Sequence, residues 1–70
     1  MNPRRSLELT EPELSNLRHL SHGLTWQETA DCRFVSVETV ASQMQLAKLK
    51  LAAKTQTHAV ALALRLGLID

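Results

Sequence analysis

The stretch from residue 25 to residue 50, TWQETADCRFVSVETVASQMQLAKLK, contains two signals for a helix start separated by a very short break. Thr25 and Ser36 are residues that cap helix N-termini, because their hydroxyl oxygen accepts a hydrogen bond from a free backbone N–H. They predict a short helix over 26–33 and a longer one over 37–51, with a three-residue turn between them. Two helices joined by so tight a turn are typical of a helix-turn-helix unit.

The longer of these helices has one apolar stripe and one polar face. Its apolar residues recur in steps of three and four, which places them on one side of a helix. The stripe consists of Val37, Val40, Met44, Ala47 and Leu51. The residues outside the stripe are Glu38, Ala41, Ser42, Gln43, Gln45 and Lys48. A row of small polar side chains on an exposed helix suits the floor of a DNA major groove.

Two further helices are predicted on either side of this unit. Thr10 and Glu13 have the spacing of a capping box, which predicts a first helix over about 11–22. Thr55 caps a fourth helix that is apolar over more than one face and ends before Gly67. Because part of this apolar surface must stay outside the core, we expect self-association through it. The expected dimer contacts are Ala59, Leu62, Ala63 and Leu66.

Composition narrows the classes of fold and compartment. The chain has no Tyr, one Phe and one Trp, which favours an all-α fold over strands. Seventy residues form at most one domain, which we expect over 9–70 after a flexible arm over 1–8. The single cysteine, Cys32, excludes an internal disulfide, and the sequence has no secretion signal and no membrane-spanning stretch. We therefore expect a cytoplasmic protein.

No pattern in the sequence predicts catalysis or a bound cofactor. His19 and His22 share a helix face at a three-residue step, but a structural zinc site would normally show closer pairs such as C-x2-C. Only two glycines occur, which leaves no Gly-rich loop to hold a phosphate. The fourth helix carries only Arg65 on its polar side, whereas membrane-surface helices are rich in Lys and Arg. We expect no enzyme activity, metal, cofactor, small-molecule ligand or membrane partner.

Taken in order, the motifs resemble the LuxR/GerE-type helix-turn-helix domain over residues 9–69. The matching residues are Leu9, Thr10, Glu13, Leu17, Gly23, Glu28, Ala30, Val35, Ser36, Thr39, Val40, Lys50, Leu51, Ala63, Gly67 and Leu68. The resemblance implies a four-helix DNA-binding domain that dimerises through its fourth helix and places its third in the major groove. It also implies a bacterial regulator, although here we expect a stand-alone domain of bacterial or phage origin.

Several residues depart from the family pattern and reduce its positive charge. Neutral residues stand where the family usually or often has a basic one or a His, namely Pro12, Ala41, Gln43 and Gln56. Arg33 replaces a core Leu and Phe34 replaces the turn Gly, so we expect Arg33 to extend outwards and Phe34 to pack on the surface of the turn. The net charge is only +1, and the basic residues of 41–70 are Lys48, Lys50, Lys54 and Arg65.

Two hypotheses of function remain open. The first is a small transcriptional regulator that binds double-stranded DNA as a homodimer. Its expected base contacts are Glu38, Ser42, Gln43 and Gln45, and its expected backbone contacts are Thr39, Lys48, Lys50 and Lys54. Gln43→Ala should then cost about 1 to 3 kcal/mol at its cognate base. The second hypothesis, motivated by the low charge, is a protein-binding module that engages a sigma factor, RNA polymerase or another LuxR-type regulator.

Overall fold

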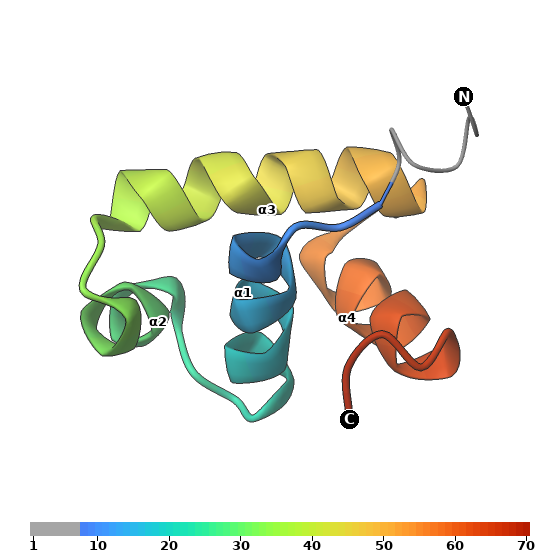
Figure 1. The fold of residues 1–70 in the computed structure, drawn as a ribbon, viewed down its shortest axis with the longest axis horizontal. Coiled ribbons are helices and arrows are strands. Elements are labelled where there is room, and N and C mark those ends of the chain that lie inside the picture. Colours follow the sequence, from blue (N-terminus) through green and yellow to red (C-terminus); the bar gives the residue numbers. More distant parts are fainter. Residues whose placement is uncertain (1–7) are drawn as a thin grey trace.

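The computed structural model describes residues 8–70, which contain four helices and no strand. The helices are α1 (Glu11–Ser21), α2 (Trp26–Arg33), α3 (Val37–Leu51) and α4 (Gln56–Arg65). The longest, α3, lies across the other three, which gather on one side of it (Figure 1). The expected all-α, four-helix fold is confirmed. The arm predicted over 1–8 lies outside the described residues, apart from Glu8.

Every helix begins at a hydroxyl residue, as the sequence predicts. At α1, Glu13 N donates to Thr10 Oγ1 at 3.3 Å and Thr10 N donates to Glu13 Oε1 at 2.8 Å. Thr25 and Glu28 form the equivalent capping box at α2, with distances of 3.1 and 2.8 Å. The remaining caps are Ser36 at α3 and Thr55 at α4. These caps pair backbone N–H groups that a helix start leaves without partners.

The core lies where α3 meets the other helices. Its largest apolar members are Leu17 of α1 and Val40 and Met44 of α3, all buried almost completely. The whole buried apolar cluster consists of Leu17, Leu20, Ala30, Val40, Met44, Ala47, Ala59, Ala63 and Ile69. Small residues in this cluster allow the helix backbones to approach closely. The inward stripe predicted for α3 is confirmed, because Val37 and Leu51 also pack against the cluster.

Trp26 joins α2 to α4. Its ring packs partly buried against the core, and its indole Nε1 donates to Gln56 Oε1 at 2.5 Å. Trp26 is therefore a packing residue at the start of α2. No helix within residues 8–70 has the length and apolar character that crossing a membrane requires.

Two residues other than glycine adopt the left-handed backbone conformation, one at the end of α2 and one at the end of α3. Phe34 has φ 59° and Ala52 has φ 54°. Both helix ends are closed by the same pair of backbone hydrogen bonds, which at α2 run from Val35 N to Ala30 O and from Phe34 N to Asp31 O. The left-handed conformation costs an L-residue about 1 to 2 kcal/mol.

Phe34 does not pack on the turn, so that expectation is wrong. Its side chain is 94% exposed. In this left-handed backbone conformation the ring lies on the outside of the turn and does not reach the core. The exposed ring therefore contributes little burial to offset the backbone strain at this position.

Phe34→Gly should raise the free energy of unfolding by about 0.5 to 1 kcal/mol, because glycine adopts positive φ without steric strain. Ala52→Gly should have a similar effect, since Ala52 is also exposed. Urea unfolding followed by circular dichroism measures both changes. Phe34→Ala is the control: it removes the ring but keeps the strain, so its stability should stay near that of the unchanged protein. A loss of stability in Phe34→Gly would show that the ring makes a stabilising contact.

Candidate nucleic-acid interface

The face of α3 turned away from the other helices contains three of the predicted base-contacting residues. Glu38, Ser42 and Gln45 are all exposed, and steps of four and three residues align them along the helix. Leu46 and Leu49 extend the same line and are 50% and 75% exposed. We call these five residues the outer stripe. It is the face that α3 leaves uncovered while the other helices lie on its opposite side (Figure 1).

Leu46 and Leu49 are not among the residues predicted to form the site. Leu46 and Leu49 follow Ser42 by four and seven residues, a spacing that places all three on the same face of a helix. This spacing could have identified them from the sequence. The same helical period that turns Val40, Met44 and Ala47 inwards turns these leucines outwards. Their position on the helix, and not their apolar character, decides their exposure.

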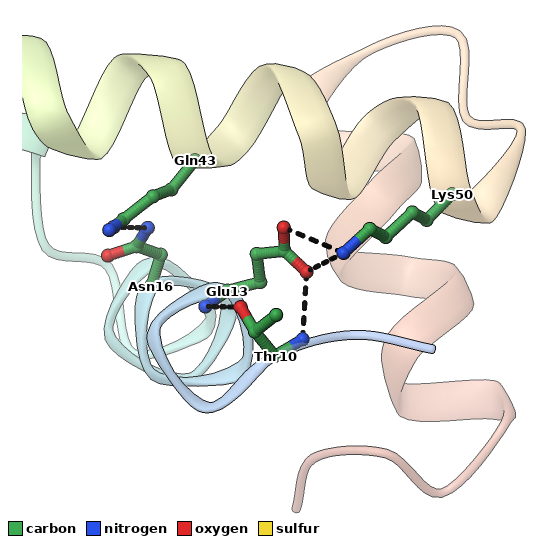
Figure 2. A network of polar contacts seen from close by, with 5 residues as sticks. All are labelled: Thr10, Glu13, Asn16, Gln43 and Lys50. Carbon is green, nitrogen blue, oxygen red and sulfur yellow. Dashed lines mark hydrogen bonds and ion pairs between the residues drawn. The ribbon is translucent and has the colours of Figure 1, made fainter. Parts of the chain in front are cut away.

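Gln43 faces α1 rather than solvent, which corrects its predicted base contact. Its Oε1 accepts hydrogen bonds from Asn16 Nδ2 at 3.0 Å and from Arg33 Nη1 at 2.7 Å. Arg33 Nη1 also donates to Asn16 Oδ1 at 2.6 Å. Figure 2 shows the side chain of Gln43 pointing from α3 towards Asn16 of α1. The physical reason is that Asn16 is fully buried and needs polar partners, which Gln43 and Arg33 provide.

Arg33 is half-buried in this network, so the expectation that it extends outwards is wrong. The guanidinium group fits at the end of α2 because two amide oxygens, one from α1 and one from α3, converge on its Nη1. We call these three residues the Arg33 network. It connects α1, α2 and α3 through polar contacts alone.

Lys50 also faces inwards, which corrects its predicted contact with the DNA backbone. Its Nζ lies 2.8 and 3.1 Å from the two carboxylate oxygens of Glu13, which also accepts from Thr10 N (Figure 2). The side chains of Lys50 and Glu13 are 19% and 2% exposed. The physical reason is that a carboxylate as buried as that of Glu13 requires an opposite charge and hydrogen-bond donors. Lys50 is therefore not free to neutralise a phosphate.

The ionisation of Glu13 depends on this pairing. Burial raises the pKa of Glu13, but the Lys50 ammonium and the N–H and hydroxyl of Thr10 lower it further than burial raises it, so that it lies below the ordinary value of 4.5. A pKa lowered by folding stabilises the folded state above the unfolded value. This stabilisation is lost as the pH falls through the lower, folded pKa.

The remaining backbone-contacting residues lie around the outer stripe. Thr39 is partly exposed in the first turn of α3, with its hydroxyl 2.9 Å from Ser36 Oγ. Lys48 is partly exposed and Lys54 is exposed just beyond the C-terminal end of α3. Within residues 8–70 neither lysine takes part in an ion pair. These three residues keep the accessibility that their predicted role requires.

The predicted dimer contacts on α4 are only partly accessible. Ala59 and Ala63 are completely buried, because they lie on the face of α4 that packs against the core. Their burial corrects the prediction that they form a surface between copies. Leu62 is half-buried and Leu66 is 63% exposed. Leu64 and Leu68 are also exposed, but Leu64 follows Leu62 by two residues and so lies on a different side of α4.

The described part of the chain contains neither a pocket nor a cluster of three or more His, Cys, Asp or Glu side chains that could hold a metal ion. The outer stripe and the residues around it form the uncovered face of α3. A short helix, a tight turn and a longer helix with one uncovered face define a helix-turn-helix protein.

Comparison with known proteins supports this class and narrows it. No family model matches the chain. The chain is 42% identical over 62 residues to the HTH-type quorum sensing-dependent transcriptional regulator VjbR of Brucella ovis, and to the same extent to VjbR of Brucella abortus. The match covers 89% of this chain and 24% of each relative, so the chain spans about a quarter of their length. The four-helix fold fits the LuxR-type helix-turn-helix domain, and the sequence matches part of a regulator of the HTH type, which confirms the resemblance.

Lys50→Met should lower the free energy of unfolding by about 2 kcal/mol at neutral pH, because Glu13 would keep its charge in a buried position. In the unchanged protein the contribution of the pair should fade as the pH falls from 4.5 through the lower folded pKa of Glu13. The stability difference between the two proteins should therefore narrow in acid. Urea unfolding at about pH 7 and about pH 3 tests this. A difference that stays constant across this range would exclude the ion pair as its cause.

Gln43→Ala should lower the free energy of unfolding by about 1 to 3 kcal/mol, because Arg33 and Asn16 would lose a buried hydrogen-bond acceptor. Gln45→Ala is a matched control on the same helix, and it should change stability by less than about 0.5 kcal/mol, because Gln45 is exposed. Thermal or urea unfolding of both variants provides the comparison. Equal stability of the two variants would contradict the inward position of Gln43.

Proposed function

We propose that this chain is the DNA-binding part of a transcriptional regulator and that it inserts α3 into the DNA major groove. The observation that carries the proposal is the outer stripe, an exposed helix face on a helix-turn-helix unit. A major groove is wide enough to admit an α-helix and presents a distinct pattern of donors and acceptors for each base pair. The similarity to relatives named as HTH-type transcriptional regulators supports the proposal.

Within this proposal Glu38, Ser42 and Gln45 contact base edges. A Gln amide pairs with adenine through two hydrogen bonds, a Glu carboxylate accepts from cytosine N4, and a Ser hydroxyl donates or accepts. Thr39 lies at the start of α3, where the helix dipole favours a phosphate. Lys48 and Lys54 neutralise phosphates at the edge of the groove.

The number of free basic residues sets the strength of sequence-independent binding. Lys50 is neutralised by Glu13, which leaves Lys48 and Lys54 from the predicted basic contacts. Each neutralised phosphate contributes about 0.9 to the slope of log K against log salt. A dimer doubles the count and is therefore part of the proposal. Its contacts would be Leu62 and Leu66, the two predicted residues that are not fully buried.

One observation favours a second candidate, a protein-binding module that engages a sigma factor, RNA polymerase or another LuxR-type regulator. Leu46 and Leu49 expose apolar surface on the helix that would otherwise contact DNA, and the net charge of the chain is only +1. Such a surface would bury its leucines against a protein, and DNA binding would be weak and insensitive to salt.

Fluorescence anisotropy with a randomised duplex pool at about 50 and 200 mM salt, followed by selection and sequencing, separates these candidates. The proposal predicts binding that weakens steeply with salt and an enriched motif with two-fold symmetry. Lys54→Gln should reduce the salt slope by about 1 for each copy, whereas Lys50→Met, in conditions where it remains folded, should leave the slope unchanged. Absence of binding at the lower salt would favour the protein-binding candidate.

A further inference from the structure

The C-terminal half of the outer stripe has an unusual composition for a surface proposed to contact DNA. Gln45, Leu46 and Leu49 are neutral, and the two leucines expose half or more of their surface. No other element within residues 8–70 covers them. A partner that buries these side chains must offer apolar groups beside hydrogen-bonding groups.

The basic residues around these leucines point to DNA as the partner. Lys48 follows Leu46 by two residues and precedes Leu49 by one, so it lies on a different side of the helix. Lys54 is exposed just beyond the end of α3. One lysine thus lies beside the three neutral residues and another lies beyond the end of the helix. This is the arrangement expected when a helix contacts base edges along its centre and phosphates at its margins.

The major groove offers one prominent apolar group, the 5-methyl group of thymine. The amide of Gln45 is suited to the adenine that pairs with thymine, because it can hydrogen-bond to adenine N6 and N7 together. Residues 45 and 49 are separated by about 6 Å along the helix, which corresponds to roughly two base-pair steps of about 3.4 Å. All three side chains can therefore contact the same short run of A·T pairs.

Resting on the proposed function, we propose that Gln45, Leu46 and Leu49 select a run of A·T pairs and that the two leucines contact thymine methyl groups. Glu38 and Ser42, nearer the N-terminus of α3, lie outside this run. Burial of the leucines against the methyl groups provides an affinity that does not depend on salt. This contribution compensates in part for the small number of free basic residues.

The test replaces thymine by uracil, which removes only the 5-methyl group and leaves base pairing intact. Two duplexes with the selected motif, one with thymine and one with uracil at the A·T run, are compared by fluorescence anisotropy. Each lost methyl contact should weaken binding about threefold to fourfold, so two contacts should weaken it about tenfold. Leu46→Ala and Leu49→Ala should each reduce this preference for thymine, and the double variant should abolish it. Circular dichroism verifies that the variants are folded.

Phe34→Ala is the matched control, because Phe34 is an exposed apolar residue outside the outer stripe and its removal should leave the thymine preference unchanged. Equal binding of the thymine and uracil duplexes would overturn the inference while leaving the proposed function intact. A preference for thymine that persists in the double leucine variant would also overturn it. If neither duplex binds at low salt, the proposed function itself fails.

Discussion

Burial of one stripe of α3 is the constraint on which the rest of this structure depends. The four helices have between 8 and 15 residues, and helices this short are marginal in water by themselves. They are held by the shared cluster in which Val40, Met44 and Ala47 occupy the centre. Because α1, α2 and α4 must all cover this stripe, they lie on one side of α3. The exposure of the opposite side, and hence the candidate interface, is a direct consequence of how the core is closed.

In addition to the apolar stripe, a second set of contacts determines how α3 is rotated about its own axis relative to α1. Gln43 and Lys50 are seven residues apart on α3, and their partners Asn16 and Glu13 are three residues apart on α1. Both contacts therefore follow from one helix crossing. Apolar side chains tolerate small rotations, whereas hydrogen bonds to buried amides and carboxylates do not. The two polar contacts thus fix which residues of α3 remain on its outer face.

The caps and the apolar stripe could be predicted from the sequence because both are local signals. Thr25, Ser36 and Thr55 start helices through contacts three residues away. The roles of Gln43 and Lys50 could not be predicted in this way, since both lie at the margin of the buried side, where only the buried Asn16 and Glu13 of α1 decide their direction. For α4 the helical period was ambiguous because apolar residues occur on several faces. Close packing, which favours Ala59 and Ala63 over leucine, decides which face is buried.

The left-handed residues in the segments that precede and follow α3 have a consequence for its mobility. Glycine is the residue that most often occupies such positions, and it gives the chain access to many neighbouring conformations. Phe34 and Ala52 are restricted by their Cβ atoms to a narrow well around φ 59° and 54°. The segments that enter and leave α3 therefore have little freedom to act as hinges. A helix held rigidly at both ends loses less conformational entropy when it binds a partner. The free energy spent on backbone strain at these positions is therefore partly offset by a lower entropic cost of binding.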